Sequence, residues 1–164
     1  MGKIGLNDRL IGEYPVTLDD AGRISLPKRF RDILQDKVWV TRGSESCLRL
    51  YTPERFDEML ENDVDDTDNR FFVKDKSKRR RILAAQDLEI DKQGRILIPS
   101  LMRESTGLFR HSVVLGQYHY VEIWAEDRYK ARLYADEEEF NDTGRSYSGV
   151  AGTDDTVSGA EGRV

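Results

Sequence analysis

The sequence contains few of the residues that support disulfide bonding or metal binding. Among its 164 residues there are one cysteine and two histidines. Cys47 alone excludes an intrachain disulfide, and its place among strand-type residues predicts a small buried side chain rather than a nucleophile. Zinc sites need three or four suitably spaced ligands, which His111 and His119 do not supply. We therefore expect no metal site and no cofactor.

Long hydrophobic runs are also missing. No stretch of the sequence is long and apolar enough to span a membrane. Residues 1–9 lack the apolar core of a signal peptide, and Leu6 occupies a position where a myristoylation signal requires Ser or Thr. We therefore expect a cytoplasmic protein with no membrane partner.

An overall positive charge is the third absence, because the formal net charge is −5. The charge is unevenly distributed. Residues 136–164 hold eight acidic and two basic side chains, which leaves residues 1–135 with a net charge of +1. Residues 54–68 are strongly acidic, whereas residues 70–81 hold seven basic side chains and one acidic one. Binding to phosphate needs a local positive surface, so a nucleic-acid partner is not excluded.

A thirteen-residue phrase occurs twice in the chain. DDAGRISLPKRFR begins at Asp19, and DKQGRILIPSLMR begins at Asp91, 72 residues later. The match continues on both sides, so that one copy runs roughly from Leu10 to Met59 and the other from Ile82 to Ala131. A unit of about fifty residues buries little surface and has low stability as an isolated domain. The duplication therefore predicts two copies that share one core.

The predicted fold class is α+β, mainly β, in three parts. Residues 1–66 form the first repeat with a following helix, and residues 67–140 form a linking helix and the second repeat. The linking helix is expected over residues 70–85, where Phe71-Phe72-Val73 must pack against other parts of the protein. Residues 141–164 form an acidic tail rich in Gly, Ser and Thr, for which we expect disorder.

Each copy has the pattern of a β-hairpin around a glycine-bearing turn. Alternating apolar residues precede the turn, and Arg-Ile follows it. Gly22 and Gly94 occupy the place where a short hairpin loop needs a positive φ. An aspartate and an arginine flank each turn and are expected to pair across it: Asp19 with Arg23, and Asp91 with Arg95.

Short helices and further strands are expected after the turns. Pro27 and Pro99 each favour a helix that begins directly after them. The residues that these helices should bury are Phe30, Ile33, Leu34, Leu101 and Met102, with Gly107 as a C-terminal stop. Strand pairs are expected at residues 38–41 with 47–51 and at 112–115 with 120–124. Each copy then enters a helical stretch, at Thr52-Pro53-Glu54 and at Ala125-Glu126-Asp127.

In combination these motifs resemble the MraZ family. The resemblance covers roughly residues 4–140 and rests on the doubled Asp-x-x-Gly-Arg turn, on Pro27-Lys-Arg-Phe-Arg, and on Val114-Leu-Gly-Gln with Val121-Glu-Ile-Trp. It implies two AbrB-like repeats interleaved in a swapped-hairpin barrel, an intrachain pseudo-dimer with flanking helices. It also implies a nucleoid-associated transcriptional regulator that forms ring-like homo-oligomers and binds promoter direct repeats upstream of division and cell-wall genes.

The resemblance associates DNA contact with the arginines of the doubled turn, Arg23 and Arg95. Each aspartate can direct the guanidinium of the paired arginine toward a phosphate or a guanine edge. Alternatively, the ion pair only stabilises the hairpin. The two roles are compatible. The motif is supported by Asp19, Gly22, Asp91 and Gly94. The following helices extend the candidate DNA surface unequally, with Lys28, Arg29 and Arg31 in the first copy and only Arg103 in the second. For these helical residues a solvated helix face is the alternative.

The basic run from Lys74 to Arg81 is a further candidate for DNA contact. A solvated face or a partner for the preceding acidic stretch is the favoured interpretation of such a run.

The doubled turn also raises two other function classes. Paired turn aspartates are typical of an aspartic-protease dyad, but these lack a supporting hydroxyl residue and are followed by arginines that hold a carboxylate ionised. We expect neither an enzyme nor a small-molecule substrate. The second alternative is an AbrB-type protein-interaction module, antitoxin-like or a ring scaffold, without direct readout of DNA.

Overall fold

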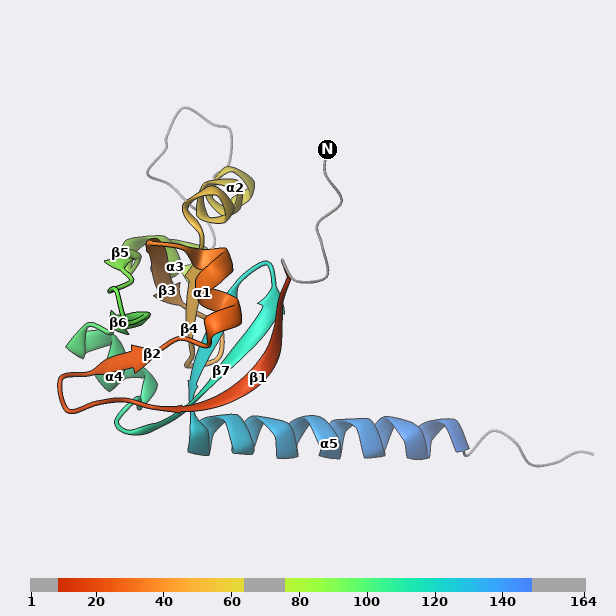
Figure 1. Cartoon of the computed structure of the whole chain (residues 1–164). Coiled ribbons are helices and arrows are strands. Elements are labelled where there is room, and N and C mark those ends of the chain that lie inside the picture. The colour runs from red at the N-terminus through yellow and green to blue at the C-terminus, as the bar shows by residue number, and fades with distance from the viewer. Residues whose placement is uncertain (1–8, 64–75, 149–164) are drawn as a thin grey trace, which may run out of the picture. The chain divides into compact units, whose positions relative to one another are not determined.

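A computed structural model describes residues 9–63 and 76–148. The chain divides into two units, Met1–Tyr129 and Lys130–Val164. Within the described residues the strands belong to the first unit (Figure 1). They are β1 (Leu10–Thr17), β2 (Arg23–Ser25), β3 (Lys37–Arg42), β4 (Leu48–Tyr51), β5 (Gln86–Glu89), β6 (Arg95–Leu97), β7 (His111–Tyr118) and β8 (Val121–Ala125). The helices are α1 (Lys28–Leu34), α2 (Pro53–Asp63), α3 (Lys76–Leu83), α4 (Ser100–Thr106) and α5 (Glu126–Ser148).

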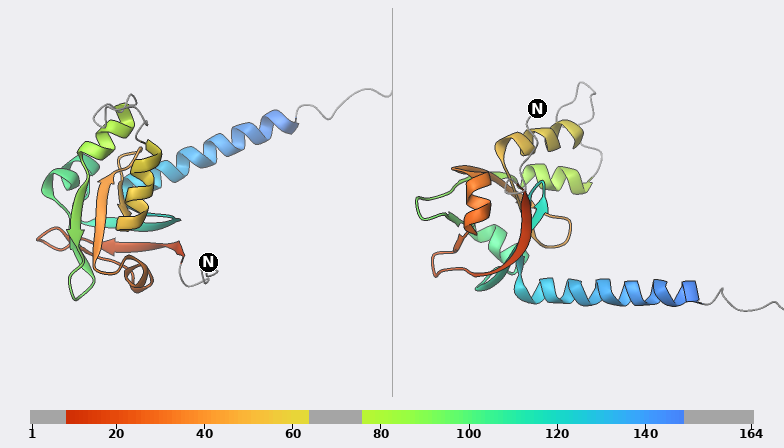
Figure 2. Two further views of the ribbon diagram at one scale, coloured as in Figure 1. Left: turned by 90° about the horizontal axis from the view of Figure 1, so that it is seen from above. Right: turned by 45° about the vertical axis from the view of Figure 1, so that its right-hand side comes forward.

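Six strands form one antiparallel sheet that is built from both copies. Its order is β1-β7-β8-β4-β3-β5, which reads the same from either end when each strand is exchanged for its counterpart in the other copy. Strand β1 of the first copy pairs with β7 of the second, beside which it runs in Figure 2. Strand β5 of the second copy pairs with β3 of the first. The expectation that the repeats share one core is confirmed by this exchange.

A separate two-stranded sheet joins the repeated phrases themselves. Strands β2 and β6 pair antiparallel, with Ile24 opposite Ile96, and we call this pair the β2–β6 ribbon (Figure 1). The two isoleucines occupy the same position of the two phrases, and both are fully buried. The backbone N–H of Leu26 donates to the carbonyl of Gly94, and that of Ile98 donates to the carbonyl of Gly22, both at 3.0 Å. Each repeated phrase therefore provides hydrogen-bond partners for the backbone of the other.

The main core draws on both copies in almost equal measure. Its apolar side chains come from the six-stranded sheet, from the β2–β6 ribbon and from helices α1 and α4. Its fully buried members include Ile24, Phe30, Val38, Val40, Leu48, Leu50, Ile96, Ile98, Leu108, Val114, Val121 and Ile123. Cys47 is also buried, as expected, in a smaller cluster with Val113, Leu115 and Trp124. Since neither copy alone supplies this set of side chains, the two copies stabilise each other.

The helices after Pro27 and Pro99 are confirmed. Helix α1 buries Phe30 and Leu34, while Ile33 is only half-buried. The backbone of Gly107 adopts φ 71° at the C-terminal end of α4, which confirms this glycine as the stop. The expected second strand pairs are also confirmed, as β3 with β4 and β7 with β8.

One core prediction for helix α4 is wrong. Met102 is buried, but Leu101 is 67% exposed. Neighbouring residues on a helix point in different directions, and only positions three or four apart share a face. Met102 shares the inward face with Thr106, so Leu101 is directed to solvent.

The simple hairpin prediction is also wrong, although the turns themselves form. Residues 18 and 24 make a single bridge across the first turn, after which β1 and β2 pair with different strands of the second copy. Alternation of apolar residues shows which face of a strand is buried but does not identify the strand with which it pairs.

The closed swapped-hairpin barrel is not confirmed either. In the described part of the chain the six-stranded sheet is open, with β1 and β5 as its edges.

The remaining helices follow the expected stretches with different limits. Helix α3 covers Lys76–Leu83 of the expected linking helix, whereas Phe71-Phe72-Val73 lie outside the described residues. Helix α5 continues through Ser148, so the disorder expected from residue 141 is wrong for residues 141–148; residues 149–164 lie outside the described residues. None of the helices in the described ranges has the length and apolarity needed to cross a membrane.

The Ile24–Ile96 contact predicts a large difference between two neighbouring residues of β6. Ile96→Ala should lower the free energy of unfolding by about 2–5 kcal/mol, because it leaves a cavity at a fully buried position. Leu97→Ala is the matched control, since Leu97 is 54% exposed, and should change it by less than about 0.5 kcal/mol. Urea unfolding followed by circular dichroism measures both. Equal losses in the two variants would contradict the inward placement of Ile96.

Candidate nucleic-acid interface

The first turn is organised by one aspartate. Asp19 accepts hydrogen bonds at Oδ1 from the backbone N–H groups of Ala21 (3.0 Å) and Arg23 (2.8 Å). Its second oxygen, Oδ2, accepts from Nε of the Arg23 side chain at 2.7 Å. The carboxylate thus holds both the turn backbone and the guanidinium, and the expected ion pair is confirmed.

The second turn repeats this arrangement. Asp91 accepts from the backbone N–H groups of Gln93 and Arg95, each at 2.9 Å, and from Nε of Arg95 at 2.9 Å. The hydrogen bond from the backbone N–H of Arg95 is the largest cause that lowers the pKa of Asp91, and that from the N–H of Arg23 does the same for the pKa of Asp19. Both aspartates are therefore held in the ionised form that orients an arginine.

The register of the β2–β6 ribbon brings the two arginines onto one face. Arg23 lies opposite Leu97, and Arg95 lies opposite Ser25. Successive side chains alternate across a strand, so these four residues point away from the face on which Ile24 and Ile96 are buried. Diagonal neighbours in an antiparallel pair are about 7–8 Å apart, which is the relation between Arg23 and Arg95. Their side chains are 40% and 27% exposed, so both remain accessible despite their ion pairs.

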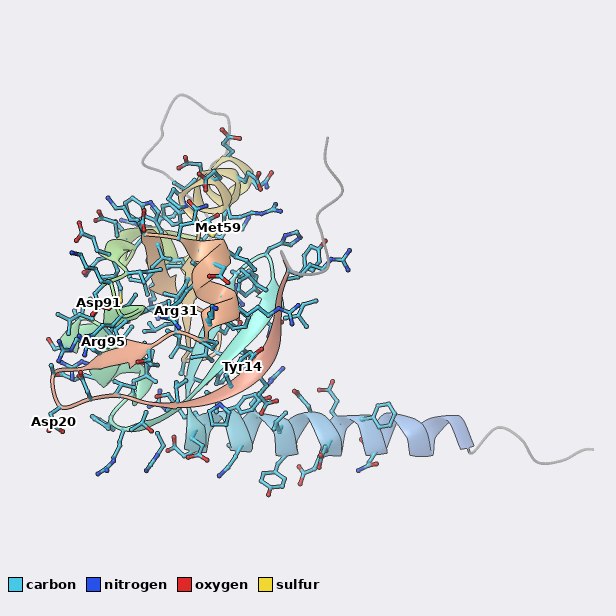
Figure 3. The ribbon with its side chains drawn as sticks, in the orientation of Figure 1. Tyr14, Asp20, Arg31, Met59, Asp91 and Arg95 are labelled. Atoms are coloured by element: carbon cyan, nitrogen blue, oxygen red, sulfur yellow. The ribbon has the colours of Figure 1, made fainter. Side chains whose placement is uncertain are left out.

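The helix arginines contact the turns of the opposite copy. Arg31 of α1 donates from Nη1 to the carbonyl of Gln93 at 3.2 Å, and its side chain lies against Gly94. Arg103, the counterpart of Arg31 in α4, lies against Gly22 in the same way. Figure 3 shows Asp20, at the tip of the first turn, and the Asp91–Arg95 pair on the same side of the view. Four of the six predicted basic residues are thereby gathered around the two turns.

Both turn glycines fit the turn conformation and leave room for the arginine beside them. Gly22 and Gly94 have φ values of 87° and 76°, a backbone region that is costly for other residues. A Cβ at Gly22 would clash with the guanidinium of Arg103, and a Cβ at Gly94 would clash with the side chain of Arg31. The glycines thus serve both the turn conformation and the close approach of an arginine.

Lys28 and Arg29 remain outside this cluster of contacts. Both are exposed at the start of helix α1, and their counterparts in α4 are the uncharged Ser100 and Leu101. Helix α1 of the first copy therefore carries more exposed basic residues than helix α4 of the second, as the sequence predicts. Lys74, the start of the basic run, lies outside the described residues, whereas Arg80 and Arg81 lie in the last turn of α3.

Two uncharged residues of the exposed face were missed by reasoning from the sequence. Ser25 and Leu97 share that face with the arginines, and Leu97 is 54% exposed although it is apolar. The signal was present in the alternation around Ile24 and Ile96, but it could be interpreted only once the two phrases were known to pair. Within residues 9–63 and 76–148, no three or more His, Cys, Asp or Glu side chains are grouped so as to hold a metal ion.

Comparison with known proteins also divides the chain into two copies. A family model described as "MraZ protein, putative antitoxin-like" matches residues 10–76 and again residues 82–146. The chain belongs to the MraZ family. The two matched segments contain the two repeats, so the family model matches each repeat separately.

Relatives of this MraZ-family chain come from diverse bacteria and share the name "Transcriptional regulator MraZ". The protein from Ligilactobacillus salivarius is 41% identical over 137 residues, which cover 80% of this chain and 92% of the relative. The protein from Thermomicrobium roseum is 35% identical over 127 residues, with 74% and 85% covered. The protein from Cutibacterium acnes is 37% identical over 132 residues, with 80% and 92% covered.

The turn aspartates of this MraZ-family chain predict a specific loss of stability in acid. The folded-state pKa of Asp19 and of Asp91 lies below the ordinary value of 3.8. Their contribution to the free energy of unfolding is therefore present above that ordinary value and is lost as the pH falls through the folded-state value. Asp19→Asn and Asp91→Asn should be less stable than the wild type at pH 7, and this difference should shrink toward pH 3.

Urea unfolding at a series of pH values measures the effect. Asp20→Asn is the matched control, because it removes an exposed carboxylate from the same turn. A difference between the wild type and Asp19→Asn that stays constant from pH 7 to about pH 3 would show that the charge of Asp19 does not stabilise the turn.

Proposed function

We propose that this protein is a transcriptional regulator that binds double-stranded DNA with the exposed face of the β2–β6 ribbon. The observation that carries the proposal is the register of the ribbon, which sets Arg23 and Arg95 diagonally on one accessible face. The major groove of B-DNA admits a two-stranded β-ribbon as well as an α-helix. The names of the MraZ relatives support a regulatory, non-catalytic role.

The two ion pairs suit the arginines for recognition. In each turn the aspartate accepts a hydrogen bond from Nε of the arginine, so the two terminal nitrogens of the guanidinium can donate to another acceptor. An arginine whose side chain is already ordered loses less conformational entropy on binding. Its outer nitrogens can donate to O6 and N7 of guanine or to phosphate oxygens. The aspartates therefore act as positioning residues for Arg23 and Arg95.

The basic residues of the helices would supply contacts to the DNA backbone. Arg31 and Arg103 flank the turns, and Lys28 and Arg29 add exposed positive charge on the side of α1 alone. Contacts to phosphate set the position of a protein on the duplex, whereas contacts to base edges specify the sequence. We therefore assign readout of bases to the ribbon and positioning to the helices, with more phosphate contacts from the first copy.

The resemblance described above extends the proposal to the target and the assembly. We propose promoter direct repeats upstream of division and cell-wall genes as the target, and a ring-like homo-oligomer in the cytoplasm, associated with the nucleoid, as the active form. Repeated DNA sites and repeated subunits suit each other, because linked binding events gain avidity without new contacts.

Removal of either ribbon arginine should weaken binding to direct-repeat DNA. Arg23→Ala and Arg95→Ala should each cost about 1–3 kcal/mol on a direct-repeat duplex if the arginine contacts a base, and much less on a scrambled duplex. If the contact is to phosphate, both duplexes should lose affinity equally and the salt dependence should decrease by about one charge. Fluorescence anisotropy titrations at several salt concentrations distinguish these results.

Arg55→Ala is the matched control for these titrations. Arg55 lies on helix α2, where its side chain pairs with Glu58 at 2.8 Å, and it belongs to neither the ribbon nor the turns. The control should bind as the wild type does. Unchanged affinity in both ribbon variants would refute the proposed interface. Lack of DNA binding by the wild type at low salt would favour the protein-interaction module instead.

A further inference from the structure

Leu97 places an apolar side chain on the exposed face of the β2–β6 ribbon. In the register of the ribbon it lies directly opposite Arg23, while Ser25 lies opposite Arg95. Leu97 is 54% exposed, whereas Ile96 and Ile98 on either side of it are fully buried. The exposed side chain is thus carried by a backbone that its buried neighbours and the pairing with β2 hold in place.

The position of Leu97 also distinguishes the two halves of the ribbon. Residues 23 and 95 are equivalent in the repeated phrases, and both are arginine. Residues 25 and 97 are equivalent too, but one is serine and the other leucine. A DNA-binding surface with two identical halves matches a palindromic site. A face whose halves differ is instead suited to a site whose two halves differ in sequence.

A leucine can recognise few of the groups that DNA exposes. Its side chain neither donates nor accepts hydrogen bonds, so it cannot contribute polar contacts to phosphates or to base edges. In the major groove the C5-methyl group of thymine is the apolar group that a base pair presents. Contact between this methyl group and an apolar side chain removes both from water, which is favourable.

The spacing within the ribbon suits joint contact by Arg23 and Leu97. Side chains directly opposite each other in an antiparallel pair have Cβ atoms about 4.5–5.5 Å apart. Successive base pairs are about 3.4 Å apart along the duplex. The two side chains can therefore reach the same base pair or neighbouring ones, with guanine as the partner of the arginine and thymine as the partner of the leucine.

We propose that Leu97 recognises thymine through its C5-methyl group and thereby gives the two halves of the DNA site different base preferences. The inference rests on the proposed function of the ribbon and names the base that one of its residues selects. Ser25, at the equivalent place beside Arg95, supplies a hydroxyl group that can hydrogen-bond to more than one base. Thymine is therefore favoured in the half of the site that faces Arg23 and Leu97.

Replacement of thymine by deoxyuridine tests the proposal, because it removes the C5-methyl group and leaves Watson–Crick pairing unchanged. Thymines of the direct-repeat duplex are replaced one at a time, and the affinity of the full chain is measured by fluorescence anisotropy. For the wild type, one such replacement should weaken binding by about fourfold, the loss that corresponds to one methyl group left unburied. Leu97→Ala should bind the original duplex more weakly than the wild type does and should no longer distinguish the two duplexes.

Two further variants serve as controls. Leu83→Ala shortens a leucine that is 75% exposed at the end of helix α3, outside the ribbon, and should retain the fourfold difference between the duplexes. Leu97→Met keeps an apolar side chain of similar volume and should retain part of that difference. Circular dichroism checks that each variant is folded, which is expected at an exposed position.

The possible failures are distinguishable. Equal sensitivity of the wild type and Leu97→Ala at every thymine, or no sensitivity in either, would overturn the inference. The proposed function would survive that result if Arg23→Ala and Arg95→Ala still weakened binding. Lack of DNA binding by the wild type would overturn both. A changed oligomeric state of Leu97→Ala in light scattering, with unchanged sensitivity to thymine, would place Leu97 against a second copy of the chain and also overturn the inference.

Discussion

The antiparallel pairing of β2 with β6 is the contact on which both the shared core and the candidate interface depend. It buries Ile24 against Ile96 and joins the two phrases by reciprocal hydrogen bonds at Gly22 and Gly94. A strand of three residues has little stability alone, so each copy supplies the partner that orders the other. Because the buried face of this ribbon is apolar, its opposite face is left for the charged residues.

Symmetry and its local loss have different consequences in this molecule. The order of the six-stranded sheet, the two aspartate-arginine turns and the reciprocal contacts of Arg31 and Arg103 all repeat between the copies. Charge does not repeat in the same way. The equivalent positions 49 and 122 carry arginine and glutamate, which form an ion pair between the two central strands of the sheet, β4 and β8. The two halves thus carry different charges at equivalent positions while their strands pair in the same arrangement.

Much of the local structure was predictable from residue types. The aspartate-arginine turns, the helices after Pro27 and Pro99, and the pairing of β3 with β4 follow from short-range chemistry that operates within a few residues. The hairpin prediction failed because β2 takes its partner from 72 residues away. The prediction that Leu101 is buried was wrong for a related reason. A short amphipathic helix presents several apolar residues, and the position of the sheet decides which of these residues are covered.

The sequence by itself determined that the chain is a duplication, that each copy carries an ionised aspartate beside an arginine, and that the two copies differ in the charge of their helices. Repeated residue types and local hydrogen bonding suffice for these conclusions. Only the tertiary structure decided that Arg23 and Arg95 share one face and that Leu97 lies directly opposite Arg23 on it. The physical reason is that strand register and helix placement depend on burial of the whole apolar core, to which residues far apart in the chain contribute together.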